Sequence, residues 1–124
     1  MKLFLIISGV IALVFGPRVV AAQDPAVVNP TSITVRLEND SVRVMEAVLE
    51  PGFREKLHAH PAYVMYVLSG GKVRLHYTNG QTRDSEFKEG AVFYSEPVTH
   101  WAENTGTTTI RVLLVEIRAL SLSR

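Results

Sequence analysis

The sequence predicts an all-β protein, an antiparallel sandwich or small barrel of about eight to ten short strands. From residue 31 onward, short runs rich in β-branched residues end at glycine, proline, asparagine or aspartate. Asn79-Gly80 stands between two extended runs, which is a strong local signal for a β-hairpin. No segment keeps the apolar spacing of a helix over several turns.

The first 22 residues are typical of a secretory signal peptide. Lys2 supplies a positive charge, and residues 3–16 form an apolar run that is shorter than the ~20 residues of a membrane-spanning helix. Pro17 follows, and small residues precede a cleavage position between Ala22 and Gln23. We therefore expect export to the periplasm or secretion. An uncleaved anchor or a buried helix is the alternative interpretation.

Composition limits the partners of the chain after cleavage. Residues 23–124 carry 11 basic and 12 acidic side chains, a formal charge of −1, and no basic run. This charge argues against nucleic acid as a partner, and loss of the apolar run argues against stable membrane insertion. The sequence has no cysteine, which excludes disulfides, thiolate metal ligands and a lipid-modified N-terminal cysteine.

The remaining chain divides into three parts. Residues 23–30 contain two prolines without a clear period, and we interpret them as an N-terminal arm or linker. Residues 31–118 hold the predicted strands, and residues 119–124 form a C-terminal tail. The extended runs read ITVRLEND, SVRVMEAVLEPG, KVRLHYTNGQTRDSEF, GAVFYSEP and TIRVLLVEIR. One domain of this length has a modest core.

Three histidines stand out as candidate metal ligands. His58 and His60 open the stretch HAHPAYVMYVLSGG, and alternate residues of a strand share a face. Two imidazoles do not make a stable site, so a third ligand is needed. His100, in the stretch EGAVFYSEPVTHWAEN, follows Gly90 by ten residues and precedes Asn104 by four.

These residues resemble the two sequence motifs of the cupin family, in the family's order and separated by the Asn79-Gly80 hairpin. The first motif corresponds to Gly52, His58, His60 and the glycine pair at 70–71, and the second to Gly90, Pro97, His100 and Asn104. The resemblance covers residues 31–118. It implies an antiparallel double-stranded β-helix, or jelly-roll barrel, with His58, His60 and His100 as metal ligands.

The resemblance is incomplete at two places. Pro97 lies one position later than in the family's pattern, and Thr99 replaces a glycine before His100. The glutamate of the first motif is missing, because its position is taken by Tyr63 or Val64. Some catalytic cupins with this change bind iron through three histidines. Three neutral imidazoles leave a divalent ion its full charge, so we expect weaker metal binding and a preference for anionic or enolisable ligands.

Several other polar residues bear on the site. We expect Glu55 and Glu103 to face away from the histidines, because each is an odd number of residues from the nearest one. Glu46 and Glu116 remain open as a fourth ligand until the strand register is known, and His76 is expected on the rim. Tyr63 is expected to pack in the core or to hydrogen-bond a metal-bound water or substrate. Asn104 is expected beside the site, holding a turn.

The resemblance implies a metal-binding small cupin with one divalent transition metal: Fe, Mn, Zn, Ni or Cu. A dioxygenase-type oxidoreductase acting on a small organic substrate is one hypothesis, since iron with open positions can bind substrate and oxygen together. The alternative is a non-catalytic module that binds a metal or a small ligand. No general base accompanies the histidines in the sequence, which argues against a hydrolase.

The stretch from residue 63 to 68 is apolar on both faces. Val64, Tyr66 and Leu68 alternate with residues expected to face the core. A strand that is apolar on both faces is usually buried on both faces. We therefore expect a homodimer, with cover by the N-terminal arm, residues 23–30, as the alternative.

Overall fold

The computed structural model describes residues 23–119, so the expected signal peptide and all but one residue of the tail lie outside the described residues. The described range holds one short helix and nine strands. They are α1 (Pro25–Val28), β1 (Ile33–Glu38), β2 (Val42–Leu49), β3 (His58–His60), β4 (Tyr63–Ser69), β5 (Gly71–Tyr77), β6 (Thr82–Phe87), β7 (Val92–Ser95), β8 (Val98–Asn104) and β9 (Ile110–Ile117). Within this range no helix has the length and apolarity to cross a bilayer.

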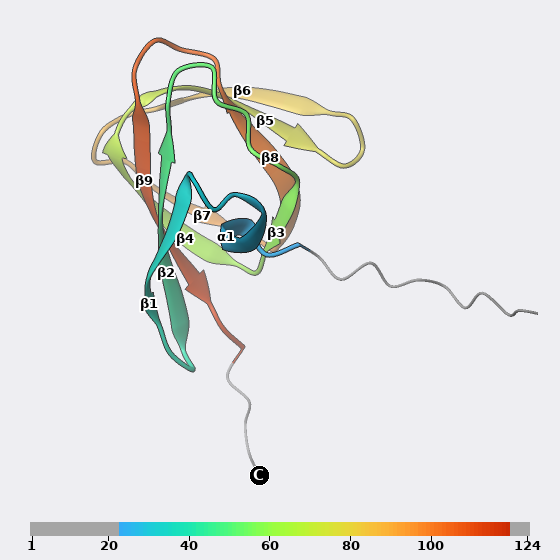
Figure 1. The fold of residues 1–124 in the computed structure, drawn as a ribbon, viewed down its shortest axis with the longest axis vertical. Coiled ribbons are helices and arrows are strands. Elements are labelled where there is room, and N and C mark those ends of the chain that lie inside the picture. Colours follow the sequence, from blue (N-terminus) through green and yellow to red (C-terminus); the bar gives the residue numbers. More distant parts are fainter. Residues whose placement is uncertain (1–22, 120–124) are drawn as a thin grey trace, which may run out of the picture.

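The nine strands form two antiparallel sheets that enclose a barrel (Figure 1). One sheet has the order β1-β2-β9-β4-β7, and the other has the order β3-β8-β5-β6. Apart from the hairpins β1–β2 and β5–β6, each strand is followed along the chain by a strand of the opposite sheet. This alternation is that of a double-stranded β-helix, and the predicted all-β jelly-roll class is confirmed.

Alternation along the strands builds the core between the sheets. In β9, Ile110, Val112 and Leu114 point inward, and their neighbours in sequence are more exposed. The inward residues of β2 continue the same layer, because β2 pairs with β9 along its whole length. The core consists of Ile33, Met45, Ala47, Leu49, Tyr63, Met65, Val67, Val73, Ala102, Ile110, Val112 and Leu114.

The predicted hairpin between the two motifs is present. β5 and β6 pair from Gly71–Phe87 to His76–Thr82, and residues 78–81 connect them. Gly80 has a φ of 82°, a left-handed conformation that glycine adopts without a steric cost. The backbone N–H of Gly80 donates to the carbonyl of Tyr77, which closes the turn.

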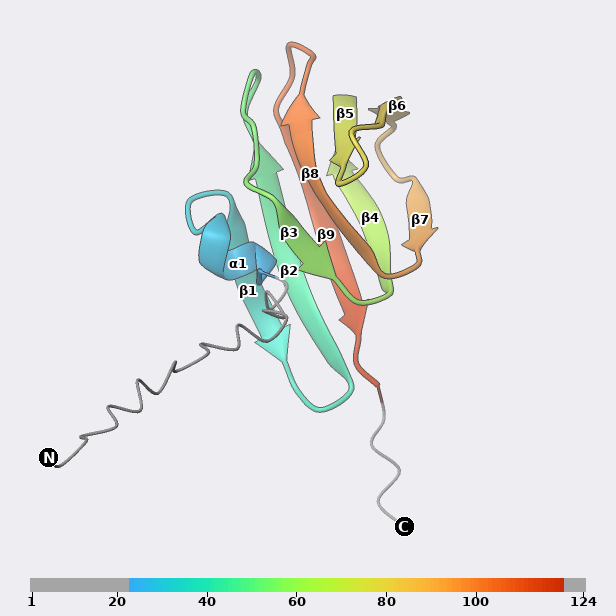
Figure 2. The ribbon, with the colours of Figure 1, turned by 90° about the vertical axis from the view of Figure 1, so that its right-hand side faces the viewer.

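The N-terminal arm forms the single turn of helix α1. Asp24 caps it by accepting a hydrogen bond from the backbone N–H of Ala26, and Pro25 occupies the first turn. The helix packs against β1 and β3 (Figure 2). Tyr66, on the outer face of β4, is 43% exposed. The arm therefore does not supply the cover for this face that was the alternative to a dimer.

Candidate metal centre

Strand register brings the three histidines together. His58 and His60 lie on the same face of β3, and His58 is directly opposite His100 of β8. The three ring centroids are 4.8 to 5.3 Å apart, and each pair of rings is within 6° of perpendicular. All three side chains are buried. A strand pair thus presents three imidazoles at the corners of a nearly equilateral triangle.

The donor set fits a divalent transition metal. One nitrogen from each ring can be chosen so that all three lie within 4.8 Å of one another. Nitrogens bound to one ion at about 2.1 Å can be at most about 4.2 Å apart, so the observed spacing is close to that of a three-histidine site. Burial lowers the pKa of His58 to about 4 and that of His100 to about 3. Both rings are therefore neutral at pH 7, as metal ligation requires.

Glu116 orients His60 from the last strand. Its Oε2 atom is 2.7 Å from Nδ1 of His60, and its Oε1 atom accepts a hydrogen bond of 2.8 Å from Nε of Arg43. Burial alone would raise the pKa of Glu116, but the hydrogen bonds from His60 and Arg43 outweigh it and lower the pKa. A carboxylate only accepts, so Nδ1 of His60 carries the proton and Nε2 is left for a metal.

The polar chain continues to the N-terminal arm. Arg43 donates from its terminal nitrogen to Asp24 at 2.5 Å, while its Nε bonds Glu116. Asp24 is the residue that caps α1. Burial opposes ionisation of Asp24, but the hydrogen bond from Arg43 and those from the helix backbone lower its pKa. Asp24, Arg43, Glu116 and His60 therefore form a continuous polar connection from the arm to the candidate centre.

His58 is also protonated at Nδ1, but its hydrogen-bond partner is a backbone carbonyl. Its Nδ1 atom is 2.7 Å from the carbonyl oxygen of Lys56, which can only accept, so Nδ1 carries the proton. Asn29 fixes this peptide on both sides: its Oδ1 accepts from the N–H of Lys56 at 2.7 Å, and its Nδ2 donates to the Lys56 carbonyl at 3.3 Å. Asn29 Nδ2 also lies 3.2 Å from Nδ1 of His58. The arm thus supports both histidines of β3.

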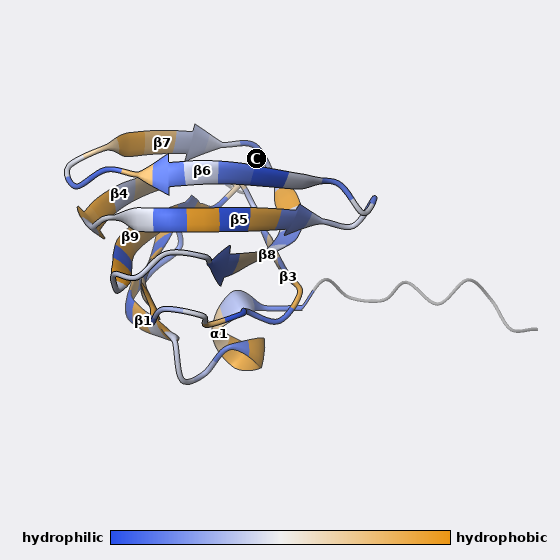
Figure 3. Ribbon diagram, turned by 90° about the horizontal axis from the view of Figure 1, so that it is seen from above, coloured by the Kyte–Doolittle hydropathy of each residue, from blue (hydrophilic) through white to orange (hydrophobic). Residues whose placement is uncertain are grey.

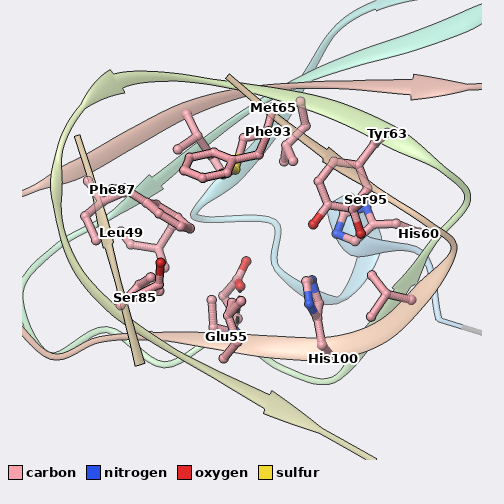
Figure 4. Close-up of a pocket in the computed structure, with 18 of the residues that line it drawn as sticks. Leu49, Glu55, His60, Tyr63, Met65, Ser85, Phe87, Phe93, Ser95 and His100 are labelled. Atoms are coloured by element: carbon pink, nitrogen blue, oxygen red, sulfur yellow. Dashed lines mark hydrogen bonds between the residues drawn. The ribbon is translucent and has the colours of Figure 1, made fainter. Parts of the chain in front are cut away.

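The histidines lie at one end of a cavity of about 180 Å³ inside the barrel. Figure 4 shows Tyr63 and Ser95 beside His60, with Met65, Phe87 and Phe93 further along the cavity. Tyr63 is buried with its ring 4.8 Å from that of His60, and burial raises the pKa of its phenol. The cavity therefore has a polar end at the histidines and an apolar end.

The expectation for Glu55 was wrong. Glu55 lines the cavity together with the three histidines, and its Oε1 accepts a hydrogen bond of 2.9 Å from the backbone N–H of Ala102 (Figure 4). The argument from odd spacing assumed an extended segment, but residues 55–57 are outside any strand. Gly52, at a φ of 82°, turns the chain just before them. Burial raises the pKa of Glu55 to about 7.

Other carboxylates predicted at or near the site are distributed differently. Glu103 faces away as expected and contacts His76 on the outer face, where the His76 ring stacks on Trp101 at 3.5 Å. Glu46 pairs with Arg36 and Arg111 on the outside of the barrel. Among Glu46 and Glu116, only Glu116 therefore reaches a histidine, and it does so at the ring nitrogen that points away from the centre.

Asn104 is buried but is not part of the cavity lining. Its amide donates to the carbonyls of Leu49 and Thr108 at 2.8 Å, and its oxygen accepts from the N–H of Gly106. These contacts stabilise the turn after β8, as the expected turn role requires, at the end of the strand away from His100.

Sequence reasoning did not identify Asn29 or Arg43. Nothing in the local sequence marks Asn29, because its partner Lys56 is 27 residues away. Glu116 had a detectable signal: it continues the inward alternation of Ile110, Val112 and Leu114, so a carboxylate on a core face could have been inferred.

A double-stranded β-helix with an H-x-H pair on one strand and a third histidine directly opposite defines a small cupin fold. Comparison with solved structures supports this class. A cupin domain from Bordetella pertussis Tohama I is 28% identical, with a TM-score of 0.65, and the match covers 70% of this chain and 92% of that one. The chain has the fold of a small cupin domain.

Two further solved structures are similar. A conserved protein with a double-stranded β-helix domain from Klebsiella pneumoniae is 25% identical, with a TM-score of 0.58, over 71% of this chain and 76% of that one. A predicted oxalate decarboxylase from Thermotoga maritima is 26% identical, with a TM-score of 0.53, over 70% and 79%. No family model matches the chain, and no protein of curated function does.

Proposed function

We propose that the protein binds one divalent transition metal through His58, His60 and His100. The observation that carries this proposal is the convergence of three buried histidines on one cavity of a cupin fold. The depressed pKa values of His58 and His100 and the hydrogen bonds to Nδ1 of His58 and His60 support it.

The chemistry that we propose for the loaded protein is a dioxygenase-type oxidation of a small organic substrate. Iron, when bound by three histidines, supplies open positions at which substrate and oxygen can meet. The chain's own residues bind and orient: the apolar end of the cavity excludes water, and the Tyr63 hydroxyl is placed to hydrogen-bond a ligand near His60.

Metal content is the direct test. Protein purified without chelator should contain about one equivalent of metal. Replacing any one of the three histidines by alanine should reduce this content sharply, because two imidazoles and water hold a divalent ion weakly. His76→Ala is the matched control, since His76 contacts Glu103 and Trp101 outside the barrel. Wild-type metal content in all four variants would exclude the site.

Oxygen uptake distinguishes a dioxygenase from a non-catalytic binding module. Iron-loaded protein should consume oxygen with some member of a panel of diketones, thiols and phenols, and His100→Ala should abolish the uptake. Metal binding without uptake across the panel would favour a non-catalytic module that binds a metal or a small ligand.

A further inference from the structure

The cavity contains a carboxylate that the metal-binding proposal does not use. Glu55 is not a partner of any ion pair among residues 23–119, and within that range the one hydrogen bond of its carboxyl group is from Ala102 N–H to Oε1. Its carboxyl group points into the cavity on the side of His100 (Figure 4). Oε2 makes no hydrogen bond with the described residues, so it is an acceptor available to a donor group on a ligand in the cavity.

The rest of the cavity limits the shape of a partner for Glu55. Its volume of about 180 Å³ is close to that of an apolar cavity known to hold benzene, roughly 150 Å³. Phe87 of β6 and Phe93 of β7 have ring centroids 5.6 Å apart. These strands lie at the edges of the two sheets and run side by side (Figure 3). The cavity as a whole thus has the volume for a single aromatic ring, and its apolar end has the lining for one.

The charged side chains that line the cavity limit the chemistry of a ligand. Besides Glu55, the side chain in the lining that carries a formal charge at neutral pH is Arg83, an exposed residue of β6. The titratable groups that share the cavity with Glu55 are His58, His60, His100, Tyr63, Tyr77, Tyr94 and Arg83. A permanent anion would meet the Glu55 carboxylate, whereas a neutral hydroxyl compound can enter an apolar cavity and donate to it.

We propose that the cavity binds a small phenol, with its hydroxyl donating to Oε2 of Glu55 beside the histidines and its ring against Phe87 and Phe93. This inference rests on the proposed function for the role of the histidines. When the site holds a cation, the phenol's O–H bond breaks, the proton forms an O–H bond on Glu55, and the electron pair stays on the phenolate oxygen. Glu55 then serves as the proton acceptor of the site.

Binding of 4-methylphenol and of its methyl ether to zinc-loaded protein tests this assignment. Zinc is redox-inert, so binding is measured without turnover, and the ether has the same ring but no proton to donate. Isothermal titration calorimetry should show at least tenfold tighter binding of the phenol. Glu55→Gln should reduce this preference to less than threefold, while its side-chain oxygen still accepts from Ala102 N–H and affinity for the ether is unchanged.

Proton release supplies an independent measurement on the same samples. At pH 8, titrations in buffers of different ionisation enthalpy should show no net proton release when wild type binds the phenol, because Glu55 takes up the proton that the phenol loses. Glu103→Gln, a carboxylate on the outer face, should match wild type in both affinity and proton release. Circular dichroism should verify that each variant folds.

The two proposals fail in different ways. Absence of zinc uptake overturns the metal site, and the phenol-to-ether comparison is then made on metal-free protein. A wild-type protein without preference for the phenol, a wild-type protein that releases one proton per phenol bound, or a Glu55→Gln variant that keeps the full preference overturns the role of Glu55 whatever the metal content.

Discussion

At the scale of single residues, hydrogen bonding to the far nitrogens of the imidazoles organises the candidate centre. The ionised Glu116 and the Lys56 carbonyl can only accept, so His60 and His58 are both protonated at Nδ1. The first motif lacks its carboxylate, but a carboxylate contacts the ring of His60 from behind. Such a partner raises the basicity of a metal-ligating histidine. The negative charge that the missing glutamate would bring to a metal is thus partly supplied by Glu116 behind the His60 ring. The positive charge of Arg43 offsets some of it.

The pKa values of the cavity predict the acid stability of the metal-free protein. For His58 and His100, the folded-state pKa values of about 4 and about 3 are below the unfolded value of about 6.5. The contribution of these two histidines to the free energy of unfolding is full above pH 6.5 and is lost as the pH falls toward 4 and 3. The pKa of Glu55 is raised to about 7, so its contribution has the opposite sign between pH 7 and about 4.5.

Acidification lowers the net stability, because the loss from the two histidines, His58 and His100, exceeds the gain from the one glutamate, Glu55. Between pH 6.5 and 5, the free energy of unfolding should fall by on the order of 1 kcal/mol per pH unit, measured by urea denaturation after chelation. Glu55→Gln should steepen this fall, and His100→Ala should flatten it. A stability that is constant across the window in all three proteins would contradict the assigned protonation states.

At the scale of elements, the arm and β3 form one unit. Asn29, directly after α1, clamps the Lys56 peptide that orients His58, and Asp24 at the other end of α1 bonds Arg43. The carbonyl of Gln23 accepts a hydrogen bond from the N–H of Ala59, between the two histidines of β3. A segment first interpreted as a linker is therefore part of the support of the site.

A pair of asparagine substitutions tests this role. Asn29→Ala should weaken metal binding by about tenfold to a hundredfold, because the Lys56 carbonyl loses its anchor and His58 its fixed orientation. Asn39→Ala is the matched control: Asn39 caps the β1–β2 turn by accepting from Ser41 and Val42 N–H, away from the histidines. It should cost about 1 kcal/mol of stability and leave metal affinity unchanged.

Competition with a chelating dye measures the metal affinity of the two variants, and thermal denaturation measures their stability. Equal metal affinity in Asn29→Ala and Asn39→Ala would show that the arm only covers the barrel.

At the scale of the whole molecule, an apolar row crosses the outside of the five-stranded sheet. Strand register aligns Leu37, Val44, Val115, Val64 and Tyr94 from β1 to β7. Next to this row, Tyr66 and Val92 are exposed by 43% and 65%. A contiguous apolar sheet face of this kind is typical of an interface. We propose that this face mediates a homodimer.

Tyr66→Lys should convert that dimer to a monomer, because a lysine charge would be buried in an apolar interface. Sedimentation velocity at micromolar concentration measures the change. Val27→Lys places the same charge on an exposed position of α1 and should remain dimeric. A wild-type protein that sediments only as a monomer would contradict the proposed interface.

Export remains a prediction from the first 22 residues. Protein isolated from the cell envelope should begin at or near Gln23, which N-terminal sequencing would determine. Retention of Met1 on protein found in the cytosol would contradict it.

The sequence by itself determined the class of fold and the identity of the three histidines. Both depend on local patterns: alternation and turn residues specify strands, and the spacing of His58, His60 and His100 matches two short motifs. Tertiary structure alone decided what surrounds them. Glu116, Arg43 and Asn29 reach the site through pairings between segments 19 to 73 residues apart. Glu55 enters the cavity because residues 55–57 lie outside any strand, so the period-two argument does not apply between Glu55 and His58. Spacing along one strand predicts which side chains share a face, but packing between strands and loops decides which groups meet across the barrel.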